Sequence, residues 1–331
     1  MDTSAPVRQP LPPLHVLGHF RDPHAGADRE LLDIAAMVRA RRPVHLWADG
    51  PAHPWYASQG VVPIRQFGGA FPHQGVLVLG GIHVNLDRWL AHTRFERVVL
   101  RYNIANHRRL FLLMEQLRCV TGLEPEISFV SPELQHAVDL RGTVEPSLIL
   151  LTSFLSVSRP PPGSRPFTIG RASRDEPGKH HADDPALYRM LAARGIGVRV
   201  MGGTCLAPAL AGVPNIELLP AGAEEMPAFL STLDAFFYRT GATYESYGRV
   251  VVEAMASGLP VVTEPRGGPG SLVAHEGTGF LAVDQEAAHD ALLRLAAEPS
   301  ARLRMGSAAR YQALARHGPG GSEGLVRPYM H

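Results

Sequence analysis

The chain has 331 residues, a length that indicates two medium domains of about 150 residues each. Hydrophobic residues make up 45% and charged residues 19% of the sequence, which excludes a disordered or fibrous protein. The 32 Lys and Arg residues nearly equal the 31 Asp and Glu residues, so the chain has no overall basic field and we expect no nucleic-acid partner.

Strand and helix patterns alternate in the first half of the sequence. Short apolar runs predict buried strands, and apolar residues at helical spacing predict helices. This β-α-β rhythm indicates a parallel sheet. The predicted strands are Leu14–Gly18, Val44–Trp47, Gly75–Leu79, Arg97–Leu100, Ile127–Val130 and Leu148–Leu151, and the predicted helices cover Asp28–Arg41 and the neighbourhoods of residues 85–93 and 105–118.

The second half repeats the rhythm after a proline-rich segment that favours a stiff linker. Its predicted strands are Phe167–Gly170, Val198–Met201, Ile216–Leu219, Ala235–Tyr238 and Leu259–Val262. Its predicted helices are Pro185–Ala193, Met226–Leu233, Tyr247–Ala256, a short one near 271–275 and a last one over about 285–315.

These elements predict an α/β protein with two doubly wound, Rossmann-like domains whose strand ends face a central cleft. The predicted boundaries are an N-terminal domain over 1–157, a linker over 158–166, a C-terminal domain over 167–317 and a tail over 318–331. We expect the tail to be loose, with docking of Val326 and Tyr329 as the alternative.

The two cysteines, Cys119 and Cys205, lack the spacing of a metal or redox motif, so we expect buried apolar thiols in a reducing compartment. Residues 1–13 lack a signal-peptide pattern, and the apolar run at 148–157 is too short to span a bilayer. The sequence therefore predicts a cytoplasmic protein. The helix near 105–118 carries Arg108, Arg109 and Arg118 beside apolar residues. We expect it to be a buried domain helix, with peripheral contact to the inner face of an anionic membrane as the alternative.

Basic residues are almost all arginine: 31 of the 32 are Arg, and the only lysine is Lys179. A site that needs a compact ammonium would retain lysine where a planar guanidinium does not fit. Chance survival on a solvated loop is the alternative explanation.

Two glutamates stand eight positions apart between two predicted strands. Glu245 lies in the strand-to-helix loop, and Glu253 lies on the apolar helix that follows. A carboxylate on such a helix needs hydrogen-bond donors when it is buried, and the hydroxyls of a ribose would supply two. The alternative is a solvated side chain or one paired with Arg249.

This region resembles the donor-binding half of the retaining GT-B glycosyltransferases of glycosyltransferase family 4. The resemblance covers about residues 167–285 and rests on the two glutamates, the following strand and the later Gly277–Leu281 segment. It implies a retaining transferase that moves a hexose-type sugar from a nucleotide-diphosphate sugar to an acceptor hydroxyl. The acceptor would be a glycan, a lipid-linked compound or a small molecule.

The resemblance also implies site residues in the C-terminal domain. Glu245 would contact the donor sugar, Glu253 would hold the ribose, and Arg171 and Lys179 would neutralise the departing diphosphate, aided by the loop amides. No Asp-x-Asp pair occurs, so we expect no metal or other cofactor; Asp183 and Asp184 are expected to cap the following helix. The donor-binding set is Gly170, Arg171, Lys179, Glu245, Ser246, Tyr247, Gly248, Glu253, Gly267 and Gly268.

The N-terminal domain departs from the family pattern. Members commonly carry a catalytic-side histidine after a central strand, where this chain has Tyr102 and Asn103, while His83 follows an earlier strand. We therefore predict His83 as the substitute catalytic-side residue, with a structural histidine as the alternative. Gly26 and Asn103 complete the acceptor side, although the Gly26 loop also fits an ordinary strand-to-helix turn. The Glu that members place beyond the Gly-Gly pair is missing after Gly268.

Other functions fit the two-domain plan less well. A nicotinamide oxidoreductase would need a Gly-x-Gly-x-x-Gly turn after a strand, and neither half contains one. A non-catalytic nucleotide-sugar-binding relative, or a nucleotide-sugar epimerase or phosphorylase on the same scaffold, stays open as an alternative.

Overall fold

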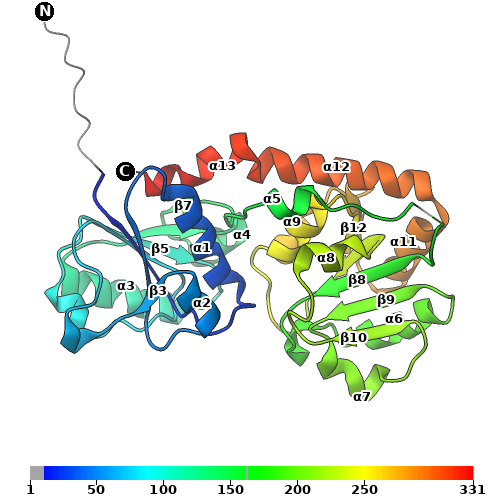
Figure 1. The fold of residues 1–331 in the computed structure, drawn as a ribbon, viewed down its shortest axis with the longest axis horizontal. Helices are drawn as coiled ribbons and strands as arrows, with labels where there is room; N and C mark the ends of the chain where they lie inside the picture. The colour runs from blue at the N-terminus through cyan, green and yellow to red at the C-terminus, as the bar shows by residue number, and fades with distance from the viewer. Residues whose placement is uncertain (1–10, 162, 331) are drawn as a thin grey trace, which may run out of the picture. The chain divides into compact units, whose positions relative to one another are not determined.

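The computed structural model describes residues 11–161 and 163–330. It divides into two compact units, one made of residues 1–148 and 323–331 and the other of residues 149–322 (Figure 1). The predicted linker, 158–166, therefore lies inside the second unit, and its Pro162 falls outside the described residues, as does most of the N-terminal segment 1–13.

The N-terminal unit contains a parallel sheet with the strand order β3-β2-β1-β4-β5-β6-β7. Leu14 of β1 pairs with Val44 of β2 on one side and Val76 of β4 on the other. The chain therefore reverses direction across the sheet at β1, and such a reversal leaves a crevice at the carboxyl ends of β1 and β4. The strands are β1 Leu14–Gly18, β2 Val44–Ala48, β3 Val61–Pro63, β4 Val76–Leu79, β5 Arg97–Tyr102, β6 Glu126–Phe129 and β7 Thr143–Val144.

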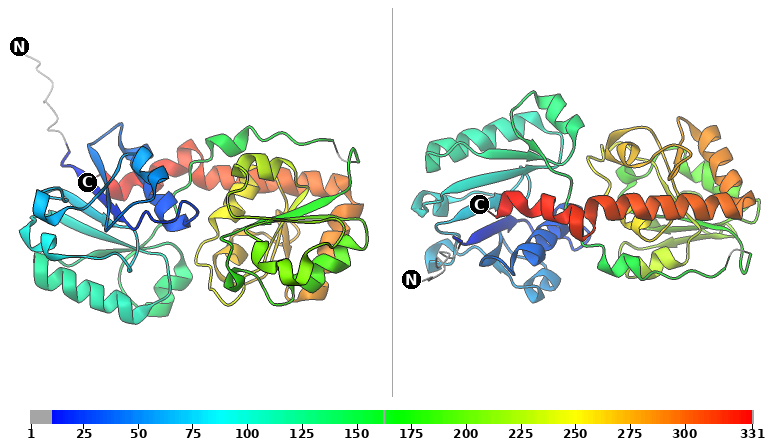
Figure 2. Two further views of the ribbon diagram at one scale, coloured as in Figure 1. Left: turned by 60° about the horizontal axis from the view of Figure 1, so that its bottom comes forward. Right: turned by 90° about the horizontal axis from the view of Figure 1, so that it is seen from above.

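Helices cover both faces of this sheet (Figure 2). Helix α1 buries Leu31, Ile34, Ala35 and Val38, whose spacing forms one apolar stripe toward the sheet. The α-helices are α1 Gly26–Val38, α2 Pro54–Ser58, α3 His107–Thr121 and α4 Pro132–Val138, with 3-10 turns at η1 Gln66–Gly68 and η2 Arg88–His92.

The C-terminal unit repeats the plan with a parallel sheet in the order β10-β9-β8-β11-β12-β13. Its strand order reverses at β8, so its own crevice lies at the carboxyl ends of β8 and β11. The strands are β8 Thr168–Ala172, β9 Gly197–Met201, β10 Ile216–Leu219, β11 Ala235–Tyr238, β12 Val261–Thr263 and β13 Gly279–Leu281. The helical elements are α5 Thr152–Leu155, η3 Pro177–Lys179, α6 Asp184–Ala192, η4 Thr204–Leu206, α7 Ala207–Leu210, α8 Met226–Ser231, α9 Arg249–Ala256, α10 Gly267–Leu272, α11 Gln285–Ala297 and α12 Pro299–His317.

The two doubly wound, parallel-sheet domains predicted from the sequence are confirmed. Two of the predicted secondary-structure elements are wrong. Residues 148–151 form no strand, although Leu148, Ile149 and Leu151 are buried as an apolar run should be. The last helix is interrupted at Glu298, because Pro299 lacks the N–H that a continuous helix needs and begins α12 instead.

The tail is ordered rather than loose. It forms α13 Pro319–Val326 and the 3-10 turn η5 Arg327–Tyr329. Val326 and Tyr329 are 4% and 1% exposed and belong to the core of the N-terminal unit. Arg42 donates a 2.8 Å hydrogen bond to the carbonyl oxygen of Tyr329. The end of the chain therefore completes the first unit.

Helix α3 buries one apolar face, made of Leu110, Leu113, Met114 and Leu117, as expected for a domain helix. The expectation of buried thiols is wrong for Cys119, which is exposed on this helix and donates to Glu115 at 3.3 Å. Among the described residues, every helix is too short or too polar to cross a bilayer.

Replacement of Tyr329 by Ala tests the role of the tail. We expect the free energy of unfolding of the N-terminal unit to fall by about 3–5 kcal/mol, because a buried ring is removed from a packed core. Denaturant titration followed by circular dichroism measures this change. Tyr311→Ala is the control, since the Tyr311 side chain is 77% exposed; its effect should stay within about 0.5 kcal/mol. Equal effects of the two substitutions would show that the tail contributes no packing.

Candidate functional site

A cation, a carboxylate and a phenol meet in the crevice of the C-terminal unit. Lys179 ends η3 in the loop after β8, and its Nζ lies 3.1 Å from Glu245 Oε2 in the loop after β11. Tyr238, the last residue of β11, donates its hydroxyl to the same oxygen at 3.2 Å. The side chains of Lys179 and Glu245 are 14% and 24% exposed, so a ligand can reach both. This trio is the Lys179–Glu245–Tyr238 cluster.

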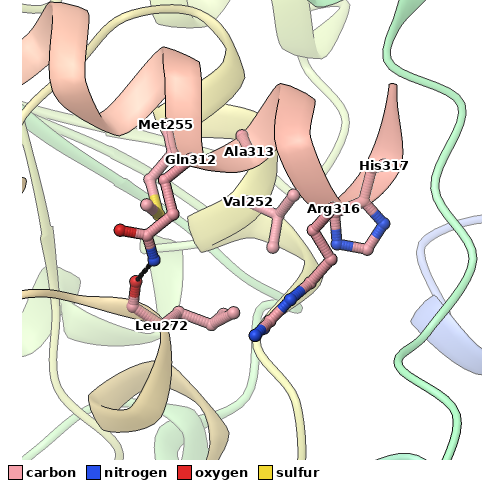
Figure 3. A pocket seen from close by; sticks show the side chains of 7 residues that line it. All are labelled: Val252, Met255, Leu272, Gln312, Ala313, Arg316 and His317. Atoms are coloured by element: carbon pink, nitrogen blue, oxygen red, sulfur yellow. Dashed lines mark hydrogen bonds between the residues drawn. The ribbon is translucent and has the colours of Figure 1, made fainter. Parts of the chain in front are cut away.

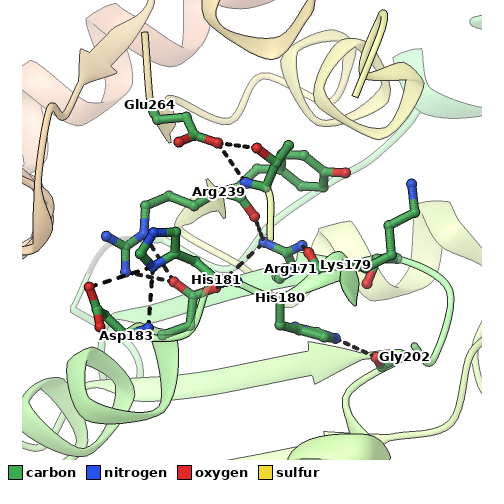
Figure 4. A network of polar contacts seen from close by, with 12 residues as sticks. Arg171, Lys179, His180, His181, Asp183, Gly202, Arg239 and Glu264 are labelled. Carbon is green, nitrogen blue, oxygen red and sulfur yellow. Dashed lines mark hydrogen bonds and ion pairs between the residues drawn. The ribbon is translucent and has the colours of Figure 1, made fainter. Parts of the chain in front are cut away.

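Arg171 lies beneath the cluster and is 1% exposed. Its Nη1 donates to the Arg239 carbonyl at 2.5 Å, its Nη2 donates to the Lys179 carbonyl, and its guanidinium stacks 4.5 Å above the Tyr238 ring. The guanidinium therefore supports the loop that carries Lys179 (Figure 4). Contact between Arg171 and a diphosphate stays a prediction.

The carboxylate that balances this buried charge is Asp184, which is fully buried at the start of α6. Its Oδ1 accepts two hydrogen bonds from Arg239, at 2.8 and 3.0 Å, and its Oδ2 lies 3.7 Å from Arg171 Nη1. The expectation that Asp183 and Asp184 cap α6 with their side chains is wrong, because Asp183 makes no side-chain cap and Asp184 binds the two arginines. Buried arginines need such a partner, since an unpaired buried charge is costly.

Gly267 and Gly268 hold the loop after β12 against the loop that contains Glu245. Gly267 has a φ of +63°, and a Cβ on Gly268 would lie 2.3 Å from the Tyr247 Cα. The Gly268 amide donates to the Glu245 carbonyl at 3.0 Å. In this structure the amide therefore has an acceptor in the protein, and its contact with a phosphate stays a prediction. Both glycines permit the close approach of two backbones.

The remaining donor-side residues, except Gly170, lie on or beside α9. Gly248 caps this helix with a φ of +89°, a conformation that favours glycine. Ser246 and Glu253 are 5% and 8% exposed, so Glu253 faces the interior rather than solvent. Gly170 is a packing residue of β8, where a Cβ would lie 2.4 Å from the Leu233 side chain.

Tyr247 anchors the Glu245 loop to α12. Its hydroxyl lies 2.8 Å from His317 Nε2, and both side chains are buried. Burial, followed by the neighbouring Arg316 and Arg249, lowers the pKa of His317 to about 3. His317 is therefore neutral at physiological pH. The side chains of α9 and α12 pack together at this point.

The small pocket beside His317 is not a substrate site. Its volume of about 10 Å³ is at the lower limit for one water molecule, far below that of a sugar nucleotide. Gln312 crosses it and donates to the Leu272 carbonyl at 2.7 Å (Figure 3). The lining residues are Val252, Met255, Leu272, Gln312, Ala313, Arg316 and His317.

The predicted acceptor-side residues lie at the carboxyl edge of the N-terminal sheet. His83 is exposed in the turn after β4, and its pKa is lowered by partial burial and by Arg109 and His19. Asn103 follows β5, and its Oδ1 lies 3.2 Å from where a Cβ on Gly81 would stand. Gly26 is the exposed first residue of α1. The structure gives none of the three a ligand contact, so their roles stay predictions.

Two side-chain hydrogen bonds in the structure were not predicted from the sequence. Tyr238 joins the Lys179–Glu245 pair, and His19 donates from Nδ1 to Asp49 at 2.8 Å in the N-terminal unit. Each of these residues ends a buried parallel strand or directly follows one, which is the signal that would have identified them. Within the described residues, no group of three or more His, Cys, Asp or Glu side chains is arranged to hold a metal ion.

The His317 environment predicts a pH-dependent stability. Because its folded pKa lies below the unfolded value of 6.5, the stabilisation is complete above pH 6.5 and decreases as the pH falls toward 3. Between pH 7.5 and 5, wild type should lose about 2 kcal/mol more of its unfolding free energy than His317→Gln, which keeps an acceptor for Tyr247 without the titration. Denaturant titrations at both pH values measure the difference. The contributions of other titrating groups to the pH dependence, such as that of buried His15, cancel because both proteins contain these groups. An identical pH dependence in both proteins would contradict a neutral, buried His317.

Part of the C-terminal unit matches a known protein family. Residues 205–312 match the family model described as glycosyl transferases group 1. No curated protein sequence matches the chain.

Several solved structures share the fold. The Anabaena protein HepE, solved with UDP and glucose, is 16% identical, with 95% of this chain and 99% of that chain covered and a TM-score of 0.72. Sucrose-phosphate synthase from Thermosynechococcus elongatus is 15% identical, with 96% and 98% covered and a TM-score of 0.69. WaaG, a glycosyltransferase of lipopolysaccharide biosynthesis, is 15% identical, with 95% and 98% covered and a TM-score of 0.66. The fold is GT-B, and the match over 205–312 identifies the protein as a glycosyltransferase.

Proposed function

We propose that the protein transfers a hexose-type sugar from a nucleotide-diphosphate sugar to an acceptor hydroxyl, with retention of configuration and without a metal ion. The observation that carries this proposal is the Lys179–Glu245–Tyr238 cluster in the crevice of the C-terminal unit, of which residues 205–312 match the glycosyl transferase family. Retention is what the family resemblance implies.

The chemistry of transfer explains why these groups belong together. Cleavage of the bond between sugar and phosphate places negative charge on the leaving diphosphate and positive charge on the anomeric carbon. The Lys179 ammonium neutralises the diphosphate, and the partly exposed Glu245 carboxylate binds sugar hydroxyls. The two side chains pair at 3.1 Å, so donor binding would replace one ion pair by two interactions.

The nucleotide end of the donor is assigned to α9. Glu253 is 8% exposed on this helix, and its carboxylate would accept hydrogen bonds from the two ribose hydroxyls. HepE was solved with UDP and with UDP-glucose, and this supports a uridine nucleotide as the first donor to test.

The acceptor class is a glycan, a lipid-linked compound or a small molecule, bound by the N-terminal unit. Exposed Phe111 and Leu112 on α3 would suit peripheral contact with a membrane that holds a lipid-linked acceptor. Arg118 is already paired with Glu115 and Glu124 on the same surface, which reduces the charge available for lipid phosphates. The free thiols of Cys119 and Cys205 support a cytoplasmic location.

Donor recognition is tested by thermal unfolding with UDP, GDP and ADP and with UDP-glucose, GDP-mannose and ADP-glucose. One nucleotide series should raise Tm in proportion to saturation, because the ligand binds only the folded state. Proton NMR of the product then gives the anomeric configuration, and addition of EDTA should leave the rate unchanged. Absence of both binding and donor consumption would reject the proposal, and an inverted product would reject retention alone.

Substitutions at the two ends of the donor should separate kinetically. Lys179→Ala should lower kcat by about 10²–10³-fold, because charge on the leaving group is then uncompensated, and Lys179→Arg should recover part of the rate. Glu253→Ala should mainly raise the donor Kd, by about 10-fold or more for the loss of hydrogen bonds from a charged group. Steady-state kinetics and calorimetry with the donor measure these effects.

Glu286→Ala is the control for the glutamate substitution, since Glu286 is an exposed residue in the first turn of α11. It should change neither kcat nor Kd. A Glu253→Ala protein with wild-type affinity would remove Glu253 from the nucleotide site.

A further inference from the structure

The loop that carries Glu245 is held between two other segments of the C-terminal unit. On one side, a Cβ on Gly268 would lie 2.3 Å from the Tyr247 Cα, and the Gly268 amide donates to the Glu245 carbonyl at 3.0 Å. On the other side, the Tyr247 side chain reaches α12. The position of the Glu245 backbone therefore depends on α12 as well as on the loop after β12.

Helix α12 packs along the length of α9. Gly306 of α12 meets the end of α9, since a Cβ on Gly306 would lie 2.2 Å from the Gly258 carbonyl oxygen. His317 of α12 lies beside the start of α9, where its Nε2 is 2.8 Å from the Tyr247 hydroxyl. Gly306 and His317 are 11 positions apart, which is about three helical turns, so both lie on the face of α12 that packs against α9. The two helices are therefore antiparallel neighbours.

Helix α12 also holds the end of α10. Gln312 donates to the carbonyl of Leu272, the last residue of α10, at 2.7 Å (Figure 3). Helix α10 begins with the Gly267–Gly268 pair that packs against the Glu245 loop. One helix thus contacts both segments that determine where Glu245 stands.

The contact between Tyr247 and His317 is buried and directional. The two side chains are 7% and 3% exposed, and their ring planes meet at 77° with centroids 6.0 Å apart. Within the described residues, His317 Nδ1 has no hydrogen-bond partner. A buried nitrogen without a partner costs free energy, and a phenylalanine ring would fill this space without that cost. What histidine adds over phenylalanine is the contact with the Tyr247 hydroxyl.

The Glu245 carboxylate needs an accurate position. Its Oε2 lies 3.1 Å from Lys179 Nζ and 3.2 Å from the Tyr238 hydroxyl, close to the upper limit for good hydrogen bonds. A shift of the loop by a fraction of an ångström would therefore weaken its contacts with a sugar hydroxyl. Lys179 lies in a different loop, supported by Arg171, so its contact with a diphosphate does not depend on α12.

We propose that His317 is a positioning residue for donor recognition: through Tyr247 it holds the Glu245 carboxylate where the donor sugar binds. This inference rests on the proposed function. His317 itself touches no substrate, because its side chain is buried against Tyr247. Loss of the contact should weaken recognition of the sugar and leave recognition of the nucleoside diphosphate intact.

Calorimetry on the full chain tests this with two probes. They are the nucleoside diphosphate that binds wild type, among UDP, GDP and ADP, and its nucleotide sugar. His317→Phe should raise the Kd of the nucleotide sugar by about 5–10-fold and that of the diphosphate by no more than about 2-fold, since only the sugar contact is weakened. It should lower kcat by about 10–10²-fold, the effect of a misplaced group. His317→Gln, which keeps a partner for the Tyr247 hydroxyl, should recover most of both losses.

A second variant and a matched control separate positioning from packing. Tyr247→Phe removes one oxygen atom and keeps the ring, and it should reproduce the effects of His317→Phe. The double variant should be no worse than either single one, because both remove the same contact. His289→Phe is the control, since His289 is also buried, on α11, and its Nδ1 lies 3.2 Å from neighbouring Asp290. It should leave kcat and the ratio of the two Kd values unchanged.

Hydrogen exchange gives a readout without turnover. The Gly268 amide donates to the Glu245 carbonyl, so peptides that cover residues 264–272 should exchange faster in both phenylalanine variants of the contact than in wild type and His289→Phe. A wild-type ratio of the two Kd values in both variants, or equal increases of both Kd values, overturns the positioning role while transfer itself stands. Failure of wild type to bind any nucleotide or consume any donor instead rejects the proposed function. Circular dichroism confirms that each variant is folded.

Discussion

A parallel, doubly wound sheet can reverse its strand order at one place, and the chemistry of this protein depends on that constraint. At the reversal the connecting helices lie on opposite faces, so the carboxyl ends of two neighbouring strands are left uncovered. In the C-terminal unit these strands are β8 and β11, and in the N-terminal unit they are β1 and β4. Lys179 follows β8, Glu245 follows β11 and His83 follows β4, so three of the candidates for a chemical role lie after these strands.

Buried charge makes the C-terminal crevice rigid. Arg171 and Arg239 share Asp184 in the interior, and Arg171 donates to the backbone carbonyls of Arg239 and Lys179. These carbonyls belong to the segments after β8 and β11, so a single guanidinium fixes both segments. The Gly267–Gly268 pair adds a third segment against the Glu245 backbone. The Lys179–Glu245 pair is thus held by parts of the chain far apart in sequence.

Much of the architecture could be predicted from the sequence because local patterns determine it. The apolar run of β1 and the helical stripe of α1 are signals within 5–13 residues, and both elements formed where expected. The strand expected at 148–151 is equally apolar but forms none, since whether an apolar run enters a sheet depends on neighbours that a sequence window does not contain. Docking of Tyr329 was an alternative to a loose tail, but its partners could not be predicted because residues such as Arg42 lie almost 300 residues earlier.

The site was predictable only in part, for the same reason. Lys179 and Glu245 were found by composition and resemblance, and their 3.1 Å contact is a tertiary event. Asp184 was expected to act locally as a helix cap, whereas its charge is used by two arginines more than ten residues away. His19 and Asp49 carry no local motif, because each is one polar residue after an apolar strand. Only the strand order brings them together.

The division between arginine and lysine follows from geometry. Arg171 donates to two carbonyls and stacks on Tyr238 at once, which requires a planar fork with several donors. Lys179 meets Glu245 through one ammonium, a compact charge that can turn from the carboxylate to a phosphate without a second bond to break. In a chain where arginine supplies 31 of the 32 Lys and Arg residues, the proposed function gives the single lysine a charge that changes partners, from Glu245 to the diphosphate. Buried Arg171, in contrast, holds two backbone carbonyls whose positions it fixes.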